Sequence, residues 1–175
     1  MLLFLVACQP DVQVAPENHT PSWQDTGVDS AAEPVFTPQE GEWVVRSSQM
    51  TLDECGLEEH SDRGTPGNIL RVVRTGESAF EVTLAGGETP ACDLVDTDYD
   101  CNDFTEYDET ANSFGLDATM PAVVSISGRF ESETEMMMRT DVYLECTGDG
   151  CDLVSWFLDT TFPCSMSMDS WIDAG

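Results

Sequence analysis

From Gly41 to the C-terminus the chain is patterned for β-strands. Apolar and polar residues alternate at every second position through most of this region. A period of two places successive side chains on opposite faces of a strand, so one face of each segment is apolar. The longest segment, Met136 to Cys146, is therefore predicted to be a strand. No apolar stripe of period 3.6 extends beyond two turns, and we expect little helix.

The predicted strands are short, and turn-forming residues separate them. Thr75-Gly-Glu-Ser78 and Thr147-Gly-Asp-Gly150 are typical of hairpin turns, in which glycine adopts positive φ. The polar stretch 53–68 is expected to be a loop, and the segment from Cys164 to Trp171 has no clear assignment. The expected strands are 42–49, 69–74, 79–84, the two arms of a hairpin over 92–101, 114–120, 124–130, 136–146 and 153–158.

About eight short strands joined by hairpins predict an all-β fold, an antiparallel meander closed or nearly closed into a small barrel. Closure removes the exposed strand edges that a secreted β protein must otherwise protect. A β-sandwich is the alternative. The side chains expected to point inward are mostly bulky, which favours a filled interior over an open cavity. They are Trp43, Phe80, Leu84, Ile126, Phe130 and Leu144.

The chain contains seven cysteines, and six of them lie in the predicted β domain. An even set in an exported domain indicates disulfides, whereas the absence of any CxxC pair makes a zinc site improbable. Cys146 and Cys151 bracket a tight turn, and Cys92 and Cys101 bracket a longer one, so each pair is expected to bond across its hairpin. By elimination, Cys55 is expected to bond to Cys164.

An apolar run at the N-terminus ends in Leu5-Val6-Ala7-Cys8. This pattern resembles the lipobox of bacterial lipoproteins, in which the chain is cut before the cysteine and the thiol receives a diacylglycerol. The resemblance implies a signal peptide over residues 1–7 and lipidation of Cys8. Signal peptides open with Lys or Arg, and none precedes this run, so we expect the natural start to lie upstream.

Residues 8–40 are predicted to be a disordered acidic tether, because they are rich in proline and polar residues and have no periodic apolar face. The predicted β domain then spans residues 41–175. In lipoproteins of many Gram-negative bacteria, a residue other than Asp after the lipidated cysteine accompanies sorting to the outer membrane. Gln9 therefore implies an outer-membrane lipoprotein, attached to the membrane through its N-terminal lipid.

Gly41-Glu-Trp43, placed just before the first strand, resembles the opening of lipocalin-like barrels. That resemblance implies a barrel whose closed end is plugged by the tryptophan and whose interior carries a small apolar ligand. The cysteine hairpins also resemble those of uncharacterised envelope lipoproteins of proteobacteria, which implies no known activity.

The formal net charge is −28, and all six basic residues are arginines. A chain this acidic repels phosphate backbones and anionic headgroups, so we expect neither nucleic-acid binding nor polybasic membrane docking. Two interpretations remain open. The acidic surface either serves solubility alone or recognises cations or a basic partner.

Alternate carboxylates at Asp96, Asp98 and Asp100 have the spacing that opens an EF-hand calcium loop. The sixth position is Cys101 instead of glycine and the twelfth is Tyr107 instead of glutamate, so only a weak Ca²⁺ site of another kind is expected. Only His60 lies in the predicted domain, and no nucleophile-elbow pattern or phosphate loop is present. We expect no enzyme and no other cofactor.

Three functions follow from the sequence. The first is a lipid-anchored, non-catalytic envelope module that binds a partner or has a structural role. The second is a lipocalin-like carrier of a small apolar ligand, and the third is a calcium-binding surface domain.

Overall fold

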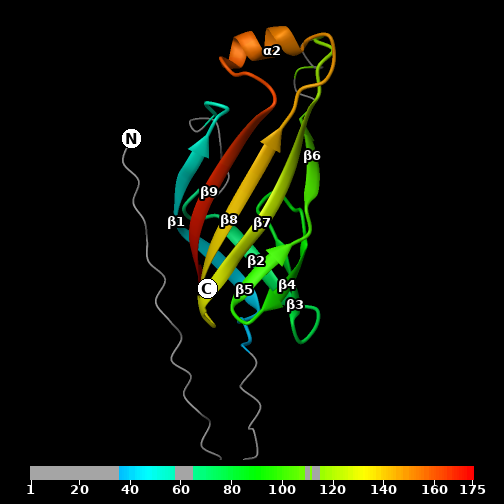
Figure 1. The fold of residues 1–175 in the computed structure, drawn as a ribbon. Coiled ribbons are helices and arrows are strands. Elements are labelled where there is room, and N and C mark those ends of the chain that lie inside the picture. Colours follow the sequence, from blue (N-terminus) through cyan, green and yellow to red (C-terminus); the bar gives the residue numbers. More distant parts are fainter. Residues whose placement is uncertain (1–35, 58–64, 109–110, 112–114) are drawn as a thin grey trace, which may run out of the picture. The chain divides into compact units, whose positions relative to one another are not determined.

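The computed structural model describes residues 36–57, 65–108, 111 and 115–175. The described elements belong to one compact unit, Pro34–Gly175. Among the residues that the structure describes, nine strands and one short helix follow one another along this unit (Figure 1). They are β1 (Gly41–Asp53), β2 (Ile69–Arg74), β3 (Ala79–Thr83), β4 (Ala91–Val95), β5 (Asp98–Cys101), β6 (Phe104–Asp108), β7 (Met120–Ser132), β8 (Glu135–Leu144), α2 (Cys151–Leu158) and β9 (Cys164–Ala174).

The strands form a closed antiparallel barrel of eight strands, as the sequence predicted. Consecutive strands pair with each other from β1 to β5 and from β7 to β9, and β9 pairs back with β1. Pairing of β5 with β7 completes the closure. β6 pairs with the same edge of β7 as β5 does, at residues of β7 that β5 does not reach. The two consecutive short strands β5 and β6 therefore lie end to end along the long strand β7.

The wall of the barrel is uneven in height. β1, β7, β8 and β9 have ten or more residues each, whereas β2 to β5 have six or fewer. β2 begins opposite Val44, yet β1 continues to Asp53 against β9. The long strands therefore extend beyond the short ones toward the end of the barrel that carries α2 (Figure 1).

Aromatic side chains fill the other end of the barrel. The rings of Trp43, Phe80 and Tyr99 all lie between 5.2 and 5.8 Å from the ring of Phe130, and Phe36 covers them at 5.4 Å from the same ring. Trp43 Nε1 donates a hydrogen bond to the backbone oxygen of Gln39 at 3.0 Å. We call the five rings together the aromatic cluster: Phe36, Trp43, Phe80, Tyr99 and Phe130. Its rings contribute both apolar burial and edge-to-face attraction.

The prediction of a strand over 153–158 was wrong, because this segment lies within helix α2. Leu153 to Leu158 is an almost unbroken apolar run, and such a run does not distinguish a strand from a short helix by its period. The strand predicted over 114–120 was also wrong. Residues 115–118 are irregular, Thr119 makes an isolated bridge to Thr147, and β7 begins at Met120.

Two strands lie where the sequence predicted none. β6 occupies the acidic segment after Cys101, where exposed charges hide the alternation. β9 is a central strand of the barrel, and its inward positions include the small residues Ser170 and Ala174. Weakly apolar inward positions give a weak period-two signal, which is why this segment had no assignment.

The cysteines bond in the three pairs that the sequence predicted: Cys55 with Cys164, Cys92 with Cys101, and Cys146 with Cys151. Cys92 and Cys101 are register partners on β4 and β5 and point into the barrel. The third pair has a different setting from the expected hairpin, since Cys151 is the first residue of α2.

Candidate binding cavity

A cavity of about 550 Å³ lies inside the barrel, on the side of the aromatic cluster that faces α2. It occupies the region where the short strands end and the long ones continue. The expectation of a filled interior is therefore correct for the aromatic end and wrong for the opposite half. The apolar part of the lining consists of Val45, Leu70, Leu84, Ala85, Met138 and Met168.

Four strands supply the buried floor of the cavity. Val45 on β1, Leu70 on β2, Met138 on β8 and Met168 on β9 are all buried. Each comes from an apolar position of a period-two pattern, so the lining follows from the same alternation that builds the barrel. Thr140 on β8 adds one buried hydroxyl to this otherwise apolar floor.

Polar residues gather at the mouth of the cavity. Thr65 and Asn68 come from the segment before β2, which is held to β1 by a hydrogen bond from Val45 N to the backbone oxygen of Asn68, 2.9 Å long. Glu88 comes from the turn between β3 and β4, and Glu106 from β6. The cavity thus has an apolar floor and a polar, acidic opening, which is the usual arrangement of small-molecule sites.

A buried hydroxyl without a partner lies next to the floor. Ser170 is fully buried on β9, between the inward residues Met168 and Ile172, and its Oγ makes no hydrogen bond within the described chain. Its register partner on β8 is Met138, which lines the cavity. An unpaired hydroxyl in an apolar interior lowers the stability of the fold.

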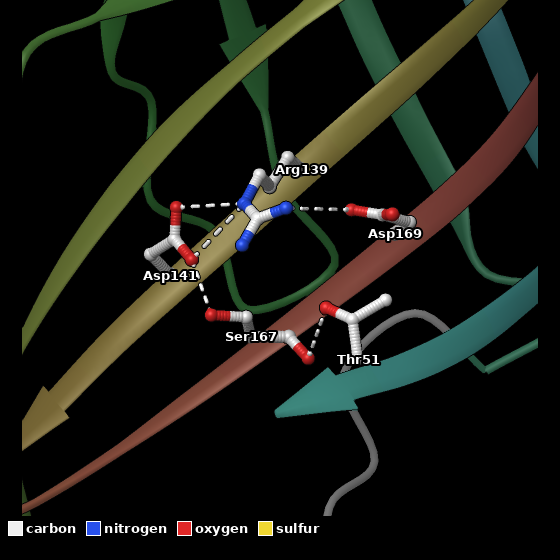
Figure 2. A network of polar contacts seen from close by, with 5 residues as sticks. All are labelled: Thr51, Arg139, Asp141, Ser167 and Asp169. Atoms are coloured by element: carbon white, nitrogen blue, oxygen red, sulfur yellow. Dashed lines mark hydrogen bonds and ion pairs between the residues drawn. The ribbon is translucent and has the colours of Figure 1, made fainter. Parts of the chain in front are cut away.

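The outer face of the barrel carries a polar network that joins three strands (Figure 2). Arg139 Nε donates to both carboxylate oxygens of Asp141 at 3.2 Å, and Arg139 Nη1 lies 3.8 Å from Asp169 Oδ1. Ser167 Oγ donates to Asp141, and Thr51 Oγ1 donates to the backbone oxygen of Ser167 at 3.2 Å. These contacts tie β1, β8 and β9 together on the outer face, although, among the described residues, Asp169 Oδ1 accepts no hydrogen bond and has only the ion pair with Arg139.

The three aspartates of the suggested calcium loop do not form a cluster. Asp96 lies in the turn between β4 and β5 with φ of 58°, and Asp98 and Asp100 point outward from β5. Asp98 Oδ1 accepts a hydrogen bond from Arg129 Nε at 2.7 Å, and this contact raises the pKa of Arg129. In the part of the chain that the structure describes, no group of three or more His, Cys, Asp or Glu is placed to hold a metal ion.

Several residues singled out in the sequence lie outside the described residues. They include Leu5, Val6, Ala7 and Cys8 of the lipobox-like pattern, and both histidines, His19 and His60. Of the cavity lining, the sequence placed Leu84 among the inward side chains and Met138 and Thr140 on one face of their strand, but it assigned inward side chains to a filled core. Asn68, Glu88 and Glu106 carried no signal, because their places beside the cavity become apparent only after the barrel closes.

Comparison with known proteins found no counterpart: no family model, curated protein or solved structure matches this chain. Among the described residues, no helix has the length and apolar character needed to cross a membrane.

Proposed function

We propose that this protein is a non-catalytic extracytoplasmic binding module whose barrel holds a small, largely apolar ligand. The cavity of about 550 Å³ carries the proposal, because it falls within the range of roughly 300–1,000 Å³ typical of small-molecule sites. Its floor, apolar except for the hydroxyl of Thr140, together with the polar groups at the mouth, favours this function over a purely structural role.

The lining defines the kind of ligand. Val45, Leu70, Met138 and Met168 offer apolar contact area at the floor, and methionine side chains adapt to ligands of different shape. At the mouth, Asn68 and Glu88 favour a ligand whose outer end carries hydrogen-bond donors. We therefore propose an amphiphilic ligand with its apolar body inward and its polar end at the opening.

The proposed location of the protein, at the outer membrane, rests on its sequence. The lipobox-like Leu5-Val6-Ala7-Cys8 supports acylation of Cys8, and Gln9 supports retention in the outer membrane. Three disulfides are consistent with an oxidising compartment. Intact-mass measurement of protein from its native cell tests this part. A chain that begins at Cys8 with a diacylglycerol is expected, and an unmodified N-terminal Met1 would refute it.

Ligand binding is tested with N-phenyl-1-naphthylamine, a neutral apolar probe whose fluorescence rises in apolar sites. Titration of the full chain is expected to give a saturable rise with one site per molecule. Ala85→Trp at the exposed mouth and Thr140→Phe at the floor are each expected to weaken binding at least roughly tenfold, since both occupy the space of the ligand.

Val95→Trp is the matched control, because Val95 is exposed and lies outside the lining. It adds the same indole as Ala85→Trp and is expected to leave binding unchanged. Melting temperatures of all variants show whether the barrel is intact. Equal probe binding by the wild type and by both cavity variants, with the fold retained, would rule out the cavity as the site.

A further inference from the structure

Helix α2 displays an apolar face to solvent. Leu153, Trp156 and Phe157 are 49%, 77% and 80% exposed. They have the spacing i, i+3, i+4, so at 100° per residue they occupy one contiguous strip along the helix. We call this strip the outer face of α2. Two adjacent aromatic residues exposed to this extent on a helix are costly in water and indicate a contact surface.

The outer face cannot turn inward, because the opposite face of α2 is already packed. Val154 is buried against Ala111 and Ala118, and Leu158 and Phe162 pack against the same small cluster. The disulfide between Cys146 and Cys151 fixes the start of the helix, and Gly150 N donates to the backbone oxygen of Asp117 at 2.8 Å.

The end of the helix is fixed as well. Thr160 N donates to the backbone oxygen of Ser155 at 3.0 Å, and Thr160 Oγ1 donates to the backbone oxygen of Cys55, beside the Cys55–Cys164 disulfide. Both ends of α2 are therefore tied to the barrel, and the three exposed side chains lie on a rigid support. Little conformational entropy is lost when a partner binds such a surface.

The surroundings of the outer face are acidic. Asp149, Asp152 and Asp159 are exposed immediately before, within and after α2. The sequence contains no lysine, arginine or histidine from residue 140 to the C-terminus. A complementary surface therefore combines an apolar centre with basic side chains around it.

We propose that the outer face of α2 docks a partner protein that presents an apolar patch flanked by Lys or Arg. This site is separate from the cavity and goes beyond the proposed function. Trp156 and Phe157 provide the central anchors, as aromatic residues do in many interfaces. Asp149, Asp152 and Asp159 provide the charged rim, which accelerates association and makes it sensitive to salt.

A lipid surface is the less favoured occupant. Exposed Trp and Phe also suit a membrane interface, but that use is typically accompanied by lysine or arginine on the polar side. Here the flanking charges are carboxylates, which anionic headgroups repel. Vesicle binding is therefore an outcome that the test must exclude.

The probe is a fluorescently labelled amphipathic helical peptide built from leucine and lysine, titrated into the full-length protein by anisotropy. A leucine–glutamate peptide of the same length serves as the charge-reversed control. We expect saturable binding of the lysine peptide only, weakening as salt increases. Trp156→Ser with Phe157→Ser is expected to weaken it at least roughly tenfold, because loss of two aromatic anchors has that scale of effect. Asp152→Asn with Asp159→Asn is expected to weaken it less and to flatten the salt dependence.

Val73→Ser with Val95→Ser is the matched control, since it removes two exposed apolar side chains from β2 and β4, outside the cluster that holds α2. If this control weakens binding as much as the α2 variant does, the peptide binds the acidic surface at large and the proposal is overturned. Retention of full affinity by the α2 variant also overturns it. Two further results also overturn it. One is binding of phosphatidylcholine or phosphatidylglycerol vesicles to the wild type but not to the α2 variant. The other is a dimer that the wild type forms and the α2 variant does not. Melting temperatures verify folding of every variant. A blue shift of the tryptophan emission of the wild type on peptide binding provides a second readout that needs no mutation.

Discussion

The phenol ring of Tyr99 lies directly over Gly128, its register partner on the neighbouring strand. A Cβ atom on Gly128 would stand 2.6 Å from Tyr99 Oη and 2.2 Å from the backbone oxygen of Met137. The hydroxyl of Tyr99 donates to that same oxygen at 3.3 Å. A residue without a side chain at position 128 thus allows a tyrosine to lie inside the barrel with its hydroxyl satisfied.

Gly128→Ala is expected to destabilise the barrel, because neither the backbone of β8 nor the packed ring can move freely. We expect a loss of about 2–3 kcal/mol in the free energy of unfolding, measured by denaturant titration. Gly76→Ala is the control, since a Cβ atom there meets only Ala79, with Ala79 Cβ at 3.5 Å and Ala79 N at 3.9 Å. Similar stability losses in the two variants would contradict the steric role of Gly128.

Alkaline pH is expected to unfold the protein partly through Tyr99. Burial raises the pKa of Tyr99 above its ordinary value of 10.0. The unfolded chain then releases this proton at lower pH than the folded chain. The contribution of Tyr99 to the free energy of unfolding is therefore fully present below pH 10 and is lost as the pH rises above it. Tyr99→Phe should lower stability at neutral pH but make its decline above pH 10 shallower, as measured by urea titration at several pH values. Tyr107→Phe, at an exposed position, should follow the wild type.

The disulfide between Cys55 and Cys164 is expected to stabilise the fold most. It closes a sequence separation of 109 residues, against 5 for Cys146–Cys151. On the chain-entropy model these loops correspond to about 5 and about 2 kcal/mol. Cys55→Ser should therefore lower the melting temperature more than Cys146→Ser does. The reverse order in calorimetry would indicate that the anchoring of α2 outweighs the entropy of the long loop.

Two serines of β9 are expected to respond in opposite ways to replacement by alanine. Ser170 Oγ is buried without a partner, so Ser170→Ala should leave stability unchanged or raise it by up to about 2 kcal/mol. Ser167 Oγ donates to the carboxylate of Asp141, so Ser167→Ala should lower stability by about 1–2 kcal/mol. Thermal melts of both variants test this, and a clear loss for Ser170→Ala would reveal a partner such as a bound water.

Much of the barrel was predictable from residue patterning. The inward positions Met136, Met138, Thr140 and Val142 of β8 are all buried, as the alternation indicated. Trp43, Phe80, Ile126 and Phe130 are buried as well. These buried positions could be predicted because a period of two fixes which side chains share a face of the strand, once one face is apolar.

The cavity and the outer face of α2 were not predictable. Bulky inward residues favoured a filled interior, but the aromatic ones gather at one end, and the other half receives Thr140, Met138 and Met168. The height along the barrel axis at which each inward side chain lies depends on the stagger of the strands. It also depends on two irregularities in the pairing of β1 with β9. Alternation does not encode that stagger.

Residues 36–40 enter the barrel at its aromatic end, where Phe36 contacts Phe130 and Gln39 N donates to the backbone oxygen of Glu133. The chain therefore enters this compact unit at the end that the rings seal. Within this compact unit, the opening of the cavity and α2 lie at the end opposite Phe36. If the proposed lipidation of Cys8 holds, the 27 residues between it and Phe36 permit a reach of at most roughly 100 Å.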